Sequence, residues 1–178
     1  DVFTKYNFAN KIIIITSIVF FYFIPFLEFG NIKKINFKKF IYNKSYYLII
    51  ALCIPIIILF DFPSNLRFGG GIFFHLSNKI LSNSLILFFI FILSMIIFKF
   101  SGIINKKNTI LFFCLIFYNI QASIYHKYFD PLIYFMILFL FEFAENKGIK
   151  INIKLFSKIL IFYSFFLILS LYKKFIVY

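Results

Sequence analysis

Hydrophobic residues form six long and nearly uninterrupted runs along the chain, at 12–29, 46–62, 80–98, 109–122, 128–144 and 159–172. A helix that crosses a membrane needs about 17 to 25 apolar residues. The first three runs reach this length, whereas the last three fall short of a full span or barely reach it. We expect these three to be tilted, extended by neighbouring residues or broken. Because the runs lack the alternation of a β-barrel strand, the predicted elements are helices.

The predicted fold class is all-α, a polytopic membrane bundle of about six transmembrane or partly inserted helices. Composition agrees with this pattern, since 63% of the 178 residues are hydrophobic, compared with about 45–50% in ordinary soluble domains. A soluble domain of this size would leave much of that apolar surface in water. We therefore predict one multi-pass domain over residues 1–178 in the cell membrane, with membrane lipids as partners.

The chain starts at Asp1 and shows no basic segment, short apolar core and small-residue cleavage site of a signal peptide. We interpret it as the C-terminal part of a longer protein, so that chemistry carried by the N-terminal part would not be represented. Cys53 and Cys114 each lie inside an apolar run without CxxC spacing. We interpret both cysteines as packing residues.

Positive charge is distributed unevenly between alternate connections. Twelve of the 19 basic residues lie in the connections after the first, third and fifth runs. By the positive-inside rule these connections are cytoplasmic, and the second and fourth connections face outward with both chain ends. The net charge of +13 then reflects topology and attraction to anionic lipid headgroups. Nucleic acid is not an expected partner, because the charges are divided among separate connections.

The uncommon polar residues all map to the predicted outward side. Apart from Asp1, they are the two remaining aspartates, the two histidines and the single arginine, namely Asp61, Asp130, His75, His126 and Arg67. In a chain that uses lysine for nearly every cation, a lone arginine suggests a planar, bidentate partner such as phosphate or carboxylate. The alternative interpretation is an interfacial arginine that contacts lipid headgroups.

The second connection combines a proline, a glycine triplet and a predicted short helix. Pro63 ends the preceding helix, and the triplet consists of Gly69, Gly70 and Gly71. From position 72 the spacing predicts a short interfacial helix that leads into the third run. Its two predicted faces carry Ile72, Phe73, Leu76 and Ile80 on one side, and His75, Asn78, Lys79 and Ser82 on the other. Free backbone N–H groups and the helix dipole would favour an anion there beside Arg67, unless the glycines are only a flexible elbow.

The fourth connection places His126, Lys127 and Asp130 between two short apolar runs. Asp130 before Pro131 has a structural interpretation as the cap and first residue of the fifth helix. His126 and Lys127 have no such explanation, and polar groups at the edge of a bilayer are functional candidates. No metal site or cofactor is expected, because the histidines and aspartates lie in separate connections without ligand spacing. HExxH, GxSxG and Walker sequences are absent.

Two segments carry a resemblance to a known family. Residues 67–77 read RFGGGIFFHLS, and residues 125–131 read YHKYFDP. Together they resemble the C-terminal part of multi-span membrane glycosyltransferases of the GT-C type, over roughly residues 61–142. The resemblance implies a hexosyltransferase that uses a polyprenyl-phosphate-linked sugar donor on the non-cytoplasmic face. The family's catalytic carboxylate lies in a first outward loop near the N-terminus, which this chain does not visibly contain.

The resemblance implies that Arg67, His126 and Lys127 contact the donor phosphate, with the backbone of Gly69, Gly70 and Gly71 beside them. Asp61, His75 and Asp130 are possible additional site residues, and the catalytic residue stays unassigned. Two other classes of function remain open. One is a lipid-linked oligosaccharide flippase, transporter or polymerase-like membrane protein, which needs cations facing a cavity. The other is a non-enzymatic membrane scaffold, which needs no convergent polar cluster.

Overall fold

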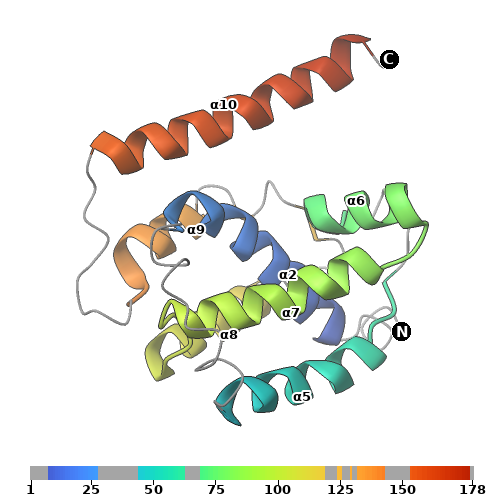
Figure 1. Cartoon of the computed structure of the whole chain (residues 1–178), viewed down its shortest axis with the longest axis vertical. Coiled ribbons are helices and arrows are strands. Elements are labelled where there is room, and N and C mark those ends of the chain that lie inside the picture. The colour runs from blue at the N-terminus through green and yellow to red at the C-terminus, as the bar shows by residue number, and fades with distance from the viewer. Residues whose placement is uncertain are drawn as a thin grey trace.

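The computed structural model describes residues 8–27, 44–62, 69–118, 124–125, 129, 132–142 and 153–176, without the side chains of 166 and 169–176. The named elements of this part of the chain are all helices, joined by turns and short connections (Figure 1). The elements are α2 (Phe8–Phe23), η1 (Ile24–Phe26), α5 (Lys44–Ile58), α6 (Gly71–Leu81), α7 (Leu85–Phe100), α8 (Lys106–Tyr118), α9 (Leu132–Phe135), η4 (Met136–Leu140) and α10 (Ile153–Ile176). The predicted all-α class is confirmed for the described residues.

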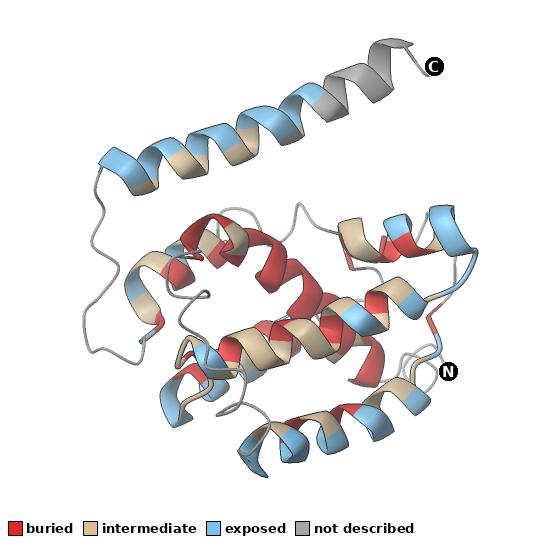
Figure 2. Ribbon diagram, viewed as in Figure 1, coloured by how far each residue is buried: buried red, intermediate tan, exposed pale blue. Residues whose placement is uncertain are grey.

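Helix α2 forms the centre of the bundle. It packs against α5, α6, α7, α8 and α9, and Ile13, Ile14 and Ile15 have no exposed surface. Figure 2 shows α2 almost entirely buried, whereas α5 and α10 are largely exposed. Its sequence explains this position, because apolar residues occupy every face and only a helix surrounded by others can bury all of them.

The predicted apolar runs correspond to helices with some shifted boundaries. The run at 80–98 is divided, because α6 ends at Leu81 and α7 starts at Leu85. Ser82 has a φ of 53°, a left-handed conformation that no helix can continue. The run at 128–144 yields α9 and the π-helical turn η4, which are together too short to cross a membrane alone.

One helix in the described residues is both long enough and apolar enough to cross a membrane, Phe8–Phe26, which combines α2 and η1. The helices Lys44–Ile58 and Leu85–Phe100 are apolar but shorter. A buried core helix of a soluble protein has the same length and composition, so this helix alone is weak evidence for a membrane protein. The polytopic arrangement and the cell-membrane location remain predictions.

The corner between α6 and α7 is fixed by Ser77, which has no exposed surface. Its hydroxyl donates to the carbonyl oxygen of Asn83 at 2.6 Å and accepts from the backbone N–H groups of Ile86 and Leu87 at 3.1 and 3.4 Å. Ser77 therefore caps the first turn of α7 from the neighbouring helix. These bonds satisfy N–H groups that have no partner inside α7.

Two buried asparagines join distant segments through backbone groups. Asn10 donates to the carbonyl oxygen of Asp61 at 2.7 Å and accepts from its N–H at 2.9 Å. Asn108 makes the same pair of bonds with the backbone of Glu142, at 2.7 and 3.0 Å. Each side-chain amide thus satisfies both the N–H and the carbonyl oxygen of one residue, as a neighbouring β-strand would. These bonds join the start of α2 to the chain after α5, and the start of α8 to the chain after η4.

Candidate functional site

The glycine triplet forms the start of α6 and is buried. All three glycines have positive φ angles, 78° at Gly69, 110° at Gly70 and 78° at Gly71. Residues with a Cβ rarely adopt this conformation, which explains the residue type at these three positions. The helix predicted from position 72 is confirmed, and it begins one residue earlier, at Gly71.

The same segment touches the fourth connection. Gly69 and Ile124 form an isolated parallel β-bridge, in which the N–H of Gly70 donates to the carbonyl oxygen of Ile124 at 2.8 Å. A Cβ at Gly69 would lie 2.3 Å from that oxygen and 3.2 Å from the Tyr125 ring. Two connections that are far apart in the sequence therefore meet backbone to backbone at the start of α6.

The remaining glycines fit against side chains of the core. A Cβ at Gly71 would lie 3.0 Å from Cγ1 of Ile18 on α2, and a Cβ at Gly70 would lie 2.3 Å from the Phe74 ring. Because Ile18 and Phe74 are each only 1% exposed, neither side chain can move aside without disturbing the core. The triplet is thus packed closely against the core, with little room for side chains larger than glycine.

The start of α6 also defines the local electrostatics. The N–H groups of the first helical turn have no acceptor within the helix, and the helix dipole places partial positive charge there. The N–H of Gly70, just before the helix, donates to the carbonyl oxygen of Ile124. A helix start of this kind favours negative charge, and binding of an anion here stays a prediction.

The structure describes only some of the other predicted site residues. Arg67, His126, Lys127 and Asp130 lie outside the described residues. Asp61 is described and exposed, and its backbone is bonded to Asn10 at the start of α2. The structure thus brings together the segments that flank Arg67 and His126, and it describes no contact of the three predicted phosphate-binding side chains.

His75 lies half-buried on α6, and its ring centroid is 5.8 Å from that of Phe74. The buried stripe of α6 consists of Gly71, Phe74 and Ser77. It therefore belongs to neither of the two faces predicted from the sequence. Leu76 and Ile80 on the predicted apolar face are 43% and 61% exposed. The first part of this face is covered, because the Phe73 ring packs on Phe20 and Phe21 of α2, whereas the described helices leave Leu76 and Ile80 exposed.

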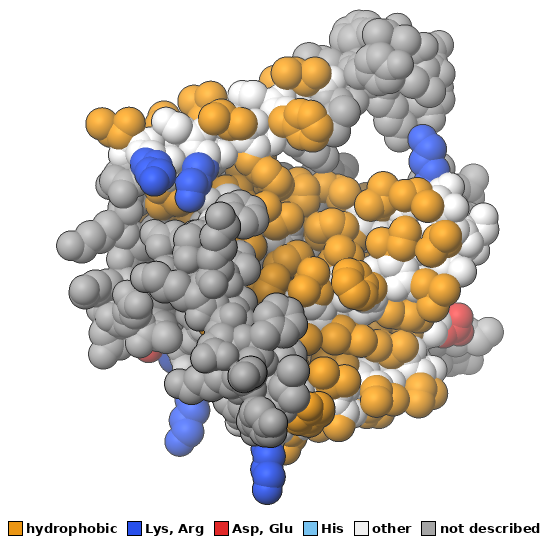
Figure 3. All heavy atoms as spheres, viewed as in Figure 1, with side chains coloured by type: hydrophobic (Ala, Val, Ile, Leu, Met, Phe, Trp, Pro, Cys, Tyr) orange, Lys and Arg blue, Asp and Glu red, His pale blue; other side chains and the backbone are white. Residues whose placement is uncertain are grey.

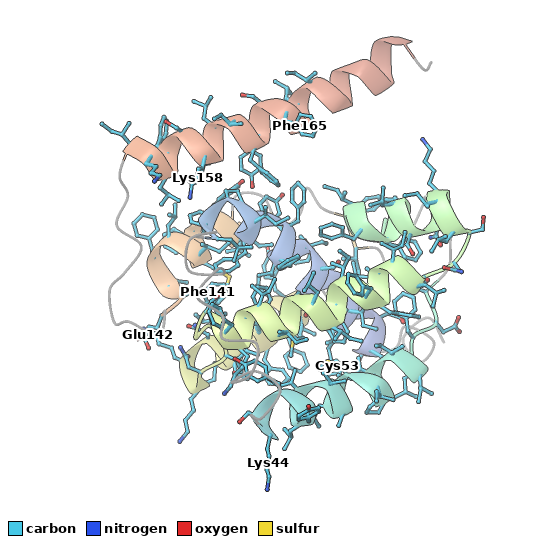
Figure 4. The ribbon with its side chains drawn as sticks, viewed as in Figure 1. Lys44, Cys53, Phe141, Glu142, Lys158 and Phe165 are labelled. Carbon is cyan, nitrogen blue, oxygen red and sulfur yellow. The ribbon has the colours of Figure 1, made fainter. Side chains whose placement is uncertain are left out.

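In the described ranges, histidine, cysteine, aspartate and glutamate residues form no group of three that could hold a metal ion. Cys53 is buried and points from α5 toward the other helices (Figure 4), whereas Cys114 is exposed, and neither is in a disulfide. The described part of the site therefore offers backbone groups and helix-terminal charge. Such groups bind and position an anion, and they do not by themselves break a bond.

Sequence reasoning did not single out Asn10 and Ile124 as residues that position this site. A signal existed for Asn10, because an amide next to a long apolar run is stable in the core only when its hydrogen bonds are satisfied. Ile124 carries no signal, since it contributes its backbone carbonyl and any residue has one. No protein-family model, curated protein or solved structure matches the chain.

Proposed function

We propose that the chain is a polytopic membrane bundle and part of a glycosyltransferase that uses a polyprenyl-phosphate-linked sugar on the non-cytoplasmic face. The observation that carries the membrane proposal is the apolar outer surface of the bundle. Leu52 and Ile58 on α5, Phe89 on α7 and Phe117 on α8 are 58%, 76%, 66% and 65% exposed. In water, these positions would be expected to carry polar side chains.

Lipid explains this surface better than a single protein partner does. Helices α5 and α10 lie on opposite sides of α2 (Figure 1), and both expose large apolar side chains, including Leu48 and Phe165. Figure 3 shows hydrophobic side chains across the described part of one face, with lysines at its edges. One partner would cover one patch, whereas a bilayer surrounds the bundle.

The lysines support the same proposal through their positions in the helices. Lys44 starts α5 and points away from the bundle (Figure 4), Lys99 lies in the last turn of α7, Lys106 starts α8, and Lys154 lies in the first turn of α10. The intervening turns of α5, α7 and α8 carry no charge. Uncharged turns with lysines at one end are typical of helices that end in the headgroup region.

The contact between Gly70 and Ile124 supports the site proposal. It joins the segment that follows Arg67 to the segment that precedes His126 and Lys127, at a buried helix start suited to an anion. A phosphate held partly out of water needs several charge-assisted donors, because a single exposed ion pair contributes only about 0–1 kcal/mol. We therefore assign Arg67, His126 and Lys127 to the donor phosphate, with the glycine backbone beside them.

A lipid-linked oligosaccharide flippase is the second candidate. The observation that favours it is the interruption between α6 and α7, together with the π-helical turn after α9. Transporters use discontinuous helices of this kind to place helix termini at a substrate. An enzyme and a flippase share the phosphate chemistry proposed here, and they differ in whether the sugar leaves its lipid carrier.

Transfer of sugar from a polyprenyl-phosphate donor to an acceptor, measured with the full protein in proteoliposomes, tests this assignment. We expect Arg67→Lys and His126→Ala to lower transfer, because lysine keeps the charge of Arg67 and loses its bidentate geometry. Lys79→Arg, at an exposed position in the last turn of α6, is the matched control and should leave transfer unchanged.

Unchanged transfer in both variants would contradict the phosphate site. Movement of the donor across the bilayer without transfer would favour the flippase. Failure of the wild-type chain to insert into the bilayer would contradict the membrane proposal itself.

A further inference from the structure

Asp61 and Gly71 lie beside different turns of α2. The backbone of Asp61 is bonded to Asn10, in the first turn of α2. Gly71 instead lies against Ile18 and Ile14, because an added Cβ would be 3.0 and 3.9 Å from their side chains. At 1.5 Å per residue, this part of α2 is roughly 9 Å further along the helix than Asn10.

Helix α6 then returns to the end of the bundle at which Asp61 lies. Phe98, near the end of α7, contacts Phe20 and Phe23 near the end of α2, with ring centroids 6.0 and 5.7 Å apart. The two helices have nearly equal lengths, so their starts lie at the same level. Ser77 caps the start of α7. The last turns of α6 therefore lie near the starts of α2 and α7, and Gly71 lies roughly 9 Å further from this end of the bundle.

We propose that Gly69 to Ser82 form the returning part of a re-entrant arrangement, in which Asp61 and Ser82 both lie on the outward side of the membrane and the glycine triplet lies below that surface. This inference rests on the proposed membrane location. Its deepest described point is the glycine triplet at the start of α6, and α7 rather than α6 crosses the bilayer. The segment thus places non-helical backbone, and the contact with Ile124, below the outward membrane surface.

The described backbone of this segment meets the requirement for non-helical structure at membrane depth. Such structure is stable only where protein covers it or water reaches it, because lipid cannot satisfy its polar groups. Gly69, Gly70 and Gly71 are buried in protein, and the N–H of Gly70 is bonded to Ile124. On the outer side of α6, the exposed side chains of Leu76 and Ile80 are apolar and suit contact with lipid.

The depth of spin labels in the bilayer tests this arrangement. Ile72, Leu76 and Ile80 lie at intervals of four residues along one side of α6, so single cysteine variants at these positions can carry nitroxide labels. In phosphatidylcholine vesicles we expect the label at 72 to be the deepest and the label at 80 the shallowest. Because eight residues of helix extend about 12 Å, the expected difference in depth approaches that length. A label at Lys79 serves as the surface reference.

Each alternative gives a different order of depths. Equal depth at all three positions would overturn the proposal and indicate a helix lying flat in the interface. A depth that increases from 72 to 80 would also overturn it, because α6 would then be the first part of a crossing helix. Thermal unfolding of the labelled variants checks that Ile72→Cys has kept the fold. Water contact at every label would contradict the membrane location instead.

Discussion

The carbonyl oxygen of Ile124 accepts a hydrogen bond from the N–H of Gly70 at 2.8 Å, across a separation of more than fifty residues. This bond joins the second and fourth connections at the start of α6. It requires a close approach of two backbones, which only glycine at position 69 permits. The stability of the candidate site should therefore depend on Gly69 more strongly than on an ordinary glycine in a turn.

We expect Gly69→Ala to lower the free energy of unfolding by roughly 3 kcal/mol or more. The methyl group would lie 2.3 Å from a backbone oxygen that cannot rotate away, in addition to the strain of a positive φ. Gly102→Ala is the control, since Gly102 has a φ of 69° in the turn after α7. Gly102→Ala should lower the free energy of unfolding by about 1–2 kcal/mol, because only the left-handed backbone conformation opposes the alanine side chain. Equal losses in denaturant titrations would contradict the close contact at Gly69.

The side chain of Asn108 should matter for stability more than its polar neighbours do. Asn108→Ala removes the partner of the backbone N–H of Glu142 and the donor to the buried side of its carbonyl oxygen, which keeps only the longer bond from Asn105 at 3.2 Å. It also removes the bond from the Asn108 amide to the carbonyl oxygen of Ile103, and we expect a loss of about 1–3 kcal/mol. Thr109→Ala is the matched control, because the exposed Thr109 hydroxyl bonds only to the carbonyl oxygen of Asn105. A comparable loss in both variants would argue against the role of Asn108 in joining the two segments.

The carboxylate of Glu142, by contrast, should contribute little. It lies 2.7 Å from the ammonium group of Lys107, but the two side chains are 55% and 58% exposed. Glu142→Gln should lower the free energy of unfolding by at most about 1 kcal/mol, and the difference should shrink as salt is added. A loss well above about 1 kcal/mol would contradict this account and show that the Glu142 carboxylate has a larger part in holding this end of the bundle.

Two buried serines allow a direct test of the cap on α7. Ser77→Ala removes an acceptor for the first N–H groups of α7, and we expect it to lower the free energy of unfolding by about 1–2 kcal/mol. Ser94 is equally buried, but its hydroxyl bonds to the carbonyl oxygen of Phe91 within the same helix. Ser94→Ala should therefore change stability less, and the reverse order would contradict the capping role.

The sequence predicted the helical class and most helix positions because length and continuous apolarity determine both. It also predicted a separate helix after the glycine triplet, from the change of pattern at Ile72. It did not predict that Gly71, Phe74 and Ser77 would be the buried stripe. Gly71 and Ser77 belong to that stripe because the backbone of α6 approaches α2 and α7 closely, and this approach depends on tertiary packing.

The candidate site was predictable only in part. The sequence indicated that unusual backbone conformations were accessible at Gly69, Gly70 and Gly71, and all three have positive φ angles. The contact between Gly70 and Ile124 was not predictable, because a backbone hydrogen bond places no requirement on the type of residue that supplies the carbonyl oxygen. The distribution of charge predicts that both connections lie on one side of the membrane, but charge alone does not determine which residues come into contact.

Collision rates of nitroxide labels in lipid vesicles test the membrane location most directly. Single labels at Leu52, Phe89 and Phe117 would sit on exposed apolar positions of α5, α7 and α8, and a label at Lys106 would sit at a charged helix end. The proposed bundle predicts frequent collisions with oxygen and few with a water-soluble nickel chelate at the first three positions, and the opposite at Lys106. Frequent collisions with the nickel chelate at all four positions would contradict it.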